Sequence, residues 1–469
     1  MTRGFTYLFL GAAMGVAAVL AGGVVRAAVT PSGAEGLALF KQVFEKAREN
    51  DFYVDAPDGS KMVESAIGGM LASLDPHSTY FDPKALNEFQ TTMKGEEFGG
   101  LGLEVMQDEG LVRVVSPIDD TPAARAGMLS GDLITKIDDT PVQGLSLKEA
   151  VDRMRGTAKT SVRLTVSRGE AKDLKEFMIV REIIRVQPVR SHVEGGDIGY
   201  IRITQFNQQT YDALKVALAK FRANPGSDKL KGYILDLRNN PGGLLAQSID
   251  VVNAFIDKGQ IVSTRGRTGD QFQAYDARAG YNLTDGKPLV VLINGGSASA
   301  SEIVSGALQD LKRAKLIGTR SFGKGSVQTV LPLIDGGALK LTTARYFTPS
   351  GRSIQAKGIE PDIKVLEDVP DDLRGKDDMK GEASLKGHLA NGAEDTTASQ
   401  AYVPPNEKDD KQLIAAIDLL HGVKHPDPAV KADAAPVKAD AATVKSDPPA
   451  PATSPAPTDP GQTTPAKPN

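Results

Sequence analysis

The sequence contains no cysteine and no tryptophan, and it has only five histidines in 469 residues. The absence of cysteine excludes disulfide bonds, thiolate metal sites and a cysteine nucleophile. The absence of tryptophan removes one common side chain for stacking on bases or sugars. A histidine-based mechanism has few candidate residues, which are His77, His192, His388, His421 and His425.

An excess of positive charge is also missing. Lysine and arginine number 55 and aspartate and glutamate 59, for a formal net charge of −4, so the composition gives no indication of nucleic acid as a partner. Hydrophobic residues make up 40% of the chain and charged residues 24%, which is ordinary for a globular protein. The length allows two or three domains, each with its own core.

A long apolar run stands at the N-terminus. Arg3 precedes the apolar residues 5–25, and small residues follow at Val25-Arg26-Ala27-Ala28. This is the layout of a secretory signal over residues 1–28. The run is also long enough to span a bilayer, so a cleaved signal and a retained membrane anchor both stay open. Either one predicts a protein exported to the periplasm or cell envelope.

The hydrophobic pattern changes several times along the rest of the chain. Residues 29–97 show helical spacing, and residues 98–182 show short alternating strands with two helices. Residues 183–366 alternate apolar strands with helices, which predicts α/β layers around a largely parallel sheet. Residues 367–425 are expected to be a partly ordered extension. Residues 426–469 form an Ala/Pro/Lys-rich tail with near-repeats, which is expected to be disordered.

Two predicted strand ends carry small and polar residues. The apolar strand at residues 233–237 ends in Arg238-Asn239-Asn240-Pro241-Gly242-Gly243, and the strand at residues 289–293 runs through Gly295–Ser301 into a helix. In open α/β sheets, sites lie at the carboxyl ends of the strands. A hairpin is also predicted from Val327 to Phe347, with its turn at Asp335-Gly336-Gly337.

Serine is concentrated at the second of these strand ends, at Ser297, Ser299 and Ser301. A serine at a helix start has an exposed hydroxyl beside backbone N–H groups, as an oxyanion hole requires. For an isolated Gly-Ser run, however, a helix N-cap is the commoner explanation. Local chemistry therefore leaves both interpretations open.

A serine nucleophile needs a base, and no histidine lies in this region. Lys324 stands between two glycines in Ser321-Phe322-Gly323-Lys324-Gly325-Ser326-Val327-Gln328. The phosphate-loop pattern fails because glycine follows this lysine. In an extended backbone Lys324, Ser326 and Gln328 point to one side. Burial lowers the pKa of a lysine toward roughly 7–8, and Gln328 is placed to hold the amine, but these residues alone do not decide the function.

Three strings between residues 98 and 182 resemble PDZ domains. Phe98-Gly99-Gly100-Leu101-Gly102-Leu103 resembles the carboxylate-binding loop, and Thr121–Gly127 and Gly131–Ile134 follow in PDZ order. Backbone N–H groups of such a loop bind the carboxylate of a peptide, and the next strand edge pairs with its chain. The predicted peptide-binding residues are Gly100, Leu101, Gly102 and Leu103.

Residues 35–365 as a whole resemble the carboxy-terminal processing (tail-specific) protease family. The resemblance is carried by the PDZ strings together with Leu74–Phe81, Leu235–Gly243, Gly296–Glu302, Phe322–Gln328 and Tyr346–Asp362. It implies an α/β protease core with crotonase/Clp-protease-like sheet-and-helix layers, an inserted PDZ domain, an N-terminal helical segment and a disordered C-terminal tail.

The resemblance also assigns roles to single residues. It implies that Ser299 is the nucleophile, Lys324 its base and Gln328 the residue that positions the base. The oxyanion hole would come from the backbone amides of Ala300 and of Gly242 or Gly243. The implied activity is that of a serine endopeptidase that forms an acyl-enzyme and needs no metal or cofactor.

The implied substrates are proteins with apolar C-termini that dock around Gly100–Val105. In relatives the PDZ domain switches the protease on with the help of an arginine. Arg155 is the candidate here, and a surface arginine favoured by the helix dipole is the alternative. Relatives sometimes use a lipoprotein adaptor, and a homo-oligomer stays open. Leu74–Phe81, with His77, is expected to be a structural turn, and Arg238 either orients the neighbouring loop or forms a salt bridge.

Three other functions are weighed against this one. A PDZ scaffold with a non-catalytic α/β domain would have lost part of the Ser–Lys–Gln set, which this sequence keeps. A histidine-type serine protease would place its catalytic domain before the PDZ domain. A crotonase-like acyl-CoA enzyme would explain neither the PDZ strings nor the export signal.

Overall fold

The computed structural model describes residues 33–50, 59–95, 97–108, 110–118, 120–168, 173–184, 187–223, 229–268, 271–371, 378–392 and 394–423. The predicted signal or anchor and the predicted disordered tail lie outside the described residues. Within those ranges, no helix combines the length and the apolar character needed to cross a membrane.

The N-terminal segment is helical, as its hydrophobic spacing predicts. Its elements are α2 (Gly33–Asn50), α3 (Gly59–Ala72), β1 (Thr79–Phe81) and α4 (Pro83–Lys94). The Asp82 side chain caps α4 by accepting the N–H of Ala85, as is typical of aspartate before a helix. Strand β1 pairs with β18 (Ala338–Phe347), so the N-terminal segment is joined to the predicted hairpin.

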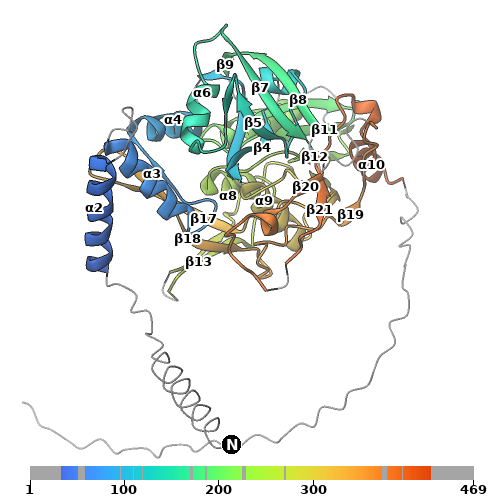
Figure 1. Cartoon of the computed structure of the whole chain (residues 1–469). Coiled ribbons are helices and arrows are strands. Elements are labelled where there is room, and N and C mark those ends of the chain that lie inside the picture. Colours follow the sequence, from blue (N-terminus) through green and yellow to red (C-terminus); the bar gives the residue numbers. More distant parts are fainter. Residues whose placement is uncertain are drawn as a thin grey trace, which may run out of the picture. The chain divides into compact units, whose positions relative to one another are not determined.

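The next segment forms an antiparallel sheet with two helices (Figure 1). Its strand order is β3-β4-β5-β7-β8, and its apolar core contains Val112, Val114, Ile134 and Leu164. Strand β3 pairs with β4 alone among the described strands, so it is an edge. The elements are β2 (Phe98–Gly100), β3 (Leu103–Asp108), β4 (Leu111–Pro117), α5 (Pro122–Arg125), β5 (Leu133–Ile137), β6 (Thr140–Pro141), α6 (Leu147–Met154), β7 (Ser161–Arg168), β8 (Asp173–Val180) and β9 (Glu182–Ile184).

The third segment holds the predicted α/β sheet, in the order β10-β11-β12-β15-β16-β19. All neighbours from β11 onward are parallel, and β10 is an antiparallel edge. Its elements are β10 (Val189–Glu194), β11 (Ile198–Ile203), α7 (Thr210–Ala223), β12 (Gly232–Asp236), α8 (Leu245–Asn253), β15 (Leu289–Ile293), α9 (Ala300–Asp310), β16 (Lys315–Gly318) and β19 (Ile363–Lys364).

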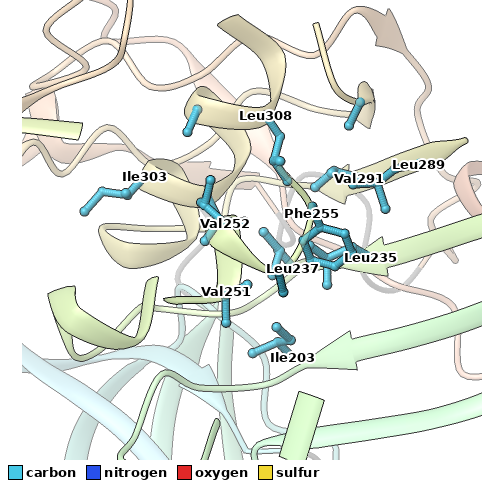
Figure 2. Close-up of a cluster of buried hydrophobic side chains, with 14 of the residues drawn as sticks. Ile203, Leu235, Leu237, Val251, Val252, Phe255, Leu289, Val291, Ile303 and Leu308 are labelled. Carbon is cyan, nitrogen blue, oxygen red and sulfur yellow. The ribbon is translucent and has the colours of Figure 1, made fainter. Parts of the chain in front are cut away.

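Both faces of this sheet are covered. On one face, side chains of β12 and β15 such as Leu235 and Val291 meet Val252 of α8 and Leu308 of α9 (Figure 2). On the other face, α10 (Lys411–Leu420) packs against the strands. Strands buried on both faces have continuous apolar sequences, which is why β12 and β15 are evident in the sequence.

A second sheet carries the predicted hairpin, formed by β17 (Ser326–Pro332) and β18. Strand β18 also pairs with β13 (Gln260–Gly266), which pairs with β14 (Phe272–Asp276). Beyond the two sheets, the C-terminal extension contains β20 (Asp378–Lys380), β21 (Ala398–Gln400) and the 3-10 turns η2 (Glu382–Ser384) and η3 (Glu407–Asp409). It packs on both predicted site loops, since the Gly295 N–H donates to Gln400 O and the Glu382 N–H donates to Phe322 O.

Candidate active site

The three serines before α9 have different surroundings. Ser297 and Ser301 are fully buried, and their hydroxyls donate to the backbone oxygens of Leu237 and Asn240, each at 2.8 Å. Ser299 is partly exposed. Two of the serines therefore join the α9 turn to the β12 loop, and only the middle hydroxyl of the three is open to a substrate.

Ser299 has an unusual backbone, with φ 55° and ψ −110°. A positive φ is costly for a residue with a side chain and is typical of functional sites. Gly242 of the neighbouring loop leaves room for this turn. A Cβ atom on Gly242 would lie 2.8 Å from Ala298 O and 2.9 Å from both Ala300 N and the Ser299 Cβ. Only glycine can approach the serine so closely.

The predicted oxyanion-hole amides lie together at this contact. The Gly242 N–H donates to Asn240 Oδ1 at 2.9 Å, so it is already used within the loop. Among the described residues, the N–H groups of Gly243 and Ala300 have no acceptor, and Gly243 is exposed. These two amides are the ones available to a developing oxyanion.

Glu302 is the main connection between the serine turn and the lysine loop. Its fully buried carboxylate accepts the N–H of Ser299 at 2.7 Å and the N–H of Lys324 at 2.9 Å. It also accepts the N–H of Gly323 and the hydroxyl of Ser321. Burial raises the pKa of Glu302 to about 7, although these four donors favour the charged form.

Tyr346 of β18 connects the same two residues through their carbonyl groups. Its buried hydroxyl lies 3.0 Å from Ser299 O and also contacts Lys324 O. No hydrogen bond joins the Ser299 hydroxyl to the Lys324 amine in this structure. The two residues are instead held by their backbones, through one carboxylate and one phenol.

Lys324 stands in a desolvated and strongly acidic environment. Burial lowers its pKa, and the charges of Glu382, Glu104, Glu302 and Asp75 oppose that shift. Burial and the charge of Lys324 lower the pKa of the neighbouring Lys340 to about 8. A desolvated lysine with a lowered pKa is suited to act as a base.

Gln328 lies four residues after Lys324, in β17. Its Nε2 donates to Ser326 Oγ at 3.0 Å and to Thr342 Oγ1 at 3.1 Å. Ser326 and Gln328 are therefore joined at the start of β17, and Thr342 of β18 belongs to the same group.

His77 belongs to a turn that reaches this cluster. Its Nε2 lies 2.9 Å from the buried carboxylate of Glu382, which also accepts a hydrogen bond from Gln355 Nε2. Burial and the charge of Lys324 lower the pKa of His77. The turn and the C-terminal extension thus meet beside the predicted base.

The segment with the PDZ strings contacts the site through two strands. Ser116 of β4 donates its hydroxyl to Asn239 O at 2.8 Å, in the loop that precedes Gly242. On β3, Leu103 and Val105 pack on the segment's own core, whereas Met106 packs against the cluster that contains Ala298 and Phe322. Glu104 lies between Leu103 and Val105 in the chain. Burial raises the pKa of its carboxyl group, and the positive charge of Lys324 opposes that rise.

The four predicted peptide-binding residues lie in β2, in the following loop and at the start of β3. Gly100 pairs with Glu182 of β9, Leu101 is buried, the Gly102 carbonyl accepts the N–H of Ile118 at 2.9 Å, and Leu103 is partly exposed. Partly buried Leu147 and Val151 of α6 belong to the same apolar cluster as Leu103 and Val105. The β3 edge, which pairs with β4 alone among the described strands, and α6 therefore border one apolar cluster.

Two predicted arginines are engaged elsewhere. Arg155 at the end of α6 forms an ion pair with Glu88 of α4, so the structure does not bring it to the serine. Arg238 is fully buried and ion-paired with Asp236 and Asp410, each at 2.7 Å, which is the salt bridge considered above. One group of ligand-type atoms, from His192, Glu194 and Glu407, lies within 4.8 Å of one another and shares no residue with the site.

Glu382 of the site has no signal in the sequence. Tyr346 and Gln355 lie in the string Tyr346–Asp362 that carries the resemblance, but no local pattern assigns them a role. Glu302 does have a signal, because a glutamate three residues after a serine at a helix start indicates reciprocal capping.

The chain is similar to known proteases over most of its length. The family model described as peptidase family S41 matches residues 197–365, and the model for the PDZ domain matches residues 113–168. A carboxy-terminal-processing protease of Bartonella bacilliformis is 53% identical over 388 residues, which is 82% of this chain and 88% of the relative. The carboxy-terminal processing protease CtpA of Bacillus subtilis is 39% identical over 325 residues, or 69% of this chain and 67% of the relative.

A solved structure has the same fold. The photosystem II D1 C-terminal processing protease superposes with a TM-score of 0.58 and 32% sequence identity, and the match covers 72% of this chain and 90% of that one.

Proposed function

Because the chain belongs to peptidase family S41 and is a carboxy-terminal processing serine protease with a PDZ domain, we propose that Ser299 is its nucleophile and Lys324 the base. One observation carries this assignment. Ser299 is the partly exposed serine of the three, and Glu302 and Tyr346 join its backbone to that of Lys324.

The reaction proceeds in two steps. The Ser299 hydroxyl attacks the peptide carbonyl carbon while the neutral Lys324 amine takes its proton. The resulting oxyanion accepts hydrogen bonds from the Gly243 and Ala300 amides. The C–N bond then breaks as Lys324 returns the proton to the leaving amine, and an acyl-enzyme remains. Water, deprotonated by the same lysine, releases the acyl group and restores the serine.

The desolvated site makes this chemistry feasible near neutral pH. A lysine in water is almost fully protonated at pH 7 and is a poor base. Burial lowers the pKa of Lys324, which increases the neutral fraction. Gln328, whose amide nitrogen is engaged by two hydroxyls, is assigned to hold the amine.

Substrates are proteins, and we assign the recognition of their apolar C-termini to the β3 edge. A tail would add to β3, with its carboxylate at Gly100–Leu103 and its side chains toward Leu147 and Val151.

The PDZ segment also touches the site itself, through Ser116, Glu104 and Met106. A tail bound on β3 would alter these contacts, so binding would control the chemistry. We keep Arg155 as the residue whose release from Glu88 would accompany that change.

The layout of residues 1–28 supports export to the periplasm or cell envelope, with residues 5–25 either cleaved or kept as an anchor. A lipoprotein adaptor and a homo-oligomer are the further partners proposed from the resemblance.

The assignment is tested with an unstructured protein that ends in apolar residues. Wild type should cleave it, and Ser299→Ala and Lys324→Ala should not. Ser305→Ala, six residues further along the chain in α9, is the control and should stay active. Cleavage by either of the first two variants would reject the proposed pair. Amidating the C-terminus of the substrate should slow the wild-type reaction, and an unchanged rate would reject carboxylate recognition.

A further inference from the structure

The amide of Gln328 has a defined orientation. A side-chain amide nitrogen has two hydrogens, and those of Gln328 go to Ser326 Oγ and Thr342 Oγ1. Both donors are thereby used, and the carbonyl oxygen Oε1 is left as an acceptor. Only this oxygen can accept a hydrogen bond from a lysine amine.

Thr342 fixes this orientation of the Gln328 amide, because the hydrogen of its own hydroxyl is already donated to another acceptor. The Thr342 hydroxyl donates to Asp75 Oδ1 at 3.0 Å, and a hydroxyl has a single hydrogen. Its lone pairs are left for Gln328 Nε2. If this hydrogen were free to turn toward Gln328, the amide could present its oxygen to Thr342 and its NH₂ group to the lysine.

Asp75 is built firmly into its turn. It is 4% exposed, and its carboxylate accepts the N–H groups of His77 and Ser78 and, at 2.5 Å, the Ser78 hydroxyl. Ser78 Oγ in turn accepts the N–H of Thr342 at 3.1 Å. A carboxylate is an acceptor only, so it sets the direction of every hydrogen bond in this chain.

We propose that Asp75 is a positioning residue for Lys324, and that it fixes the Gln328 amide through Thr342 with the carbonyl oxygen toward the amine. The turn predicted to be merely structural is therefore part of the catalytic apparatus. Asp75 lies outside residues 197–365, which match the protease family model. The inference rests on the proposed role of Lys324 as base.

Neighbouring threonines on β18 supply a matched test. Thr342 bonds to Gln328, whereas Thr343 pairs with Thr329 at 2.6 Å on the exposed side of the same two strands. Valine replaces threonine with nearly the same shape but without the hydroxyl. Thr342→Val should lower kcat by roughly tenfold or more with little change in KM, and Thr343→Val should not.

Two readouts separate positioning from a general structural effect. The rate at which a fluorophosphonate probe labels Ser299 reports activation of the nucleophile without a peptide tail, and it should fall in Thr342→Val as kcat does. Thr342→Ser keeps the hydroxyl and should restore both rates. Asp75→Asn should also lower both, because its NH₂ group can donate to Thr342 and reverse the chain of hydrogen bonds. Thermal unfolding identifies any variant that fails to fold, and Asp75→Asn then replaces Thr342→Val as the deciding variant.

Equal labelling and cleavage rates in Thr342→Val and Thr343→Val would overturn the inference. So would a loss of activity in Thr342→Ser as large as in Thr342→Val. Lys324→Ala in the same series separates an error in the role of Asp75 from an error in the identity of the base. If it is inactive while Thr342→Val is fully active, only the role of Asp75 is wrong; if it cleaves, the proposed base is wrong.

Discussion

The proposed nucleophile and the proposed base are held in different ways. Ser299 and the amides of Gly243 and Ala300 lie in two loops of one parallel sheet, and Asn240 joins these loops. Lys324 depends on segments from opposite ends of the chain, with Asp75 and His77 on one side and Glu382 on the other. The groups proposed to stabilise the oxyanion thus belong to the α/β core. Around the proposed base, in contrast, lie segments from outside that core. The core places the serine and the two amides. Burial lowers the pKa of Lys324, and most of the charges that oppose this, those of Glu382, Glu104 and Asp75, come from segments outside that core.

The largest effect should follow from crowding the nucleophile side. Gly242→Ala would place a Cβ atom 2.8 Å from Ala298 O, at φ +103°. We expect a loss of kcat of roughly a hundredfold or more, measured with a peptide substrate. Gly286→Ala, also at positive φ but with open space around it, should retain activity. Equal losses in both variants would show that backbone strain, and not the contact with the serine turn, is responsible.

The next effect tests the connection between the two sides. Glu302→Gln replaces a carboxylate that accepts four hydrogen bonds by an amide with a single acceptor oxygen. The NH₂ group of the glutamine must then face some of the four donors. We expect kcat to fall by roughly 10–100-fold, and Tyr346→Phe, which removes the contact with Ser299 O and Lys324 O, to lose roughly tenfold. If both variants keep wild-type rates of fluorophosphonate labelling, these contacts do not hold the pair.

A smaller effect should appear on the base side, as a shift of the pH profile. The charge of Glu382 raises the pKa of Lys324, so Glu382→Gln should lower that pKa further. The acid limb of the kcat/KM profile, which follows deprotonation of the lysine, should therefore move to lower pH. A shift to higher pH, or none, would contradict the placement of this charge. Glu394→Gln, on the same extension but paired with His388, is the control.

The smallest effect concerns stability. The pKa of Glu302 is raised from 4.5 to about 7 in the folded protein. Its contribution to the free energy of unfolding is therefore fully present below about pH 4.5 and is lost as the pH rises through about 7. Glu302→Gln does not titrate, so its Tm relative to wild type should become more favourable between pH 5 and pH 8. A pH-independent difference in Tm would mean that the carboxylate is not desolvated.

This division also explains what the sequence could predict. Strands β12 and β15 are evident because burial on both faces requires continuous apolar residues, and the serine turn follows directly from the end of β15. The hairpin is evident from the Asp335-Gly336-Gly337 turn. Glu382 could not be predicted, because its place depends on a contact between the Glu382 N–H and Phe322 O, 60 residues apart in number. Arg155 could not be placed either, since its partner Glu88 lies in a different helix.

Strand β3 imposes a limit on how this protease can change. Its residues Leu103 and Val105 pack on the core of the PDZ segment, whereas Met106 packs on the cluster that contains Ala298 and Phe322, and the charge of Lys324 acts on Glu104. With the tail bound as proposed above, tail preference and basal activity depend on alternate positions of one strand. Substitutions on β3 can then change one without the other, whereas a one-residue insertion would exchange the two faces and disturb both.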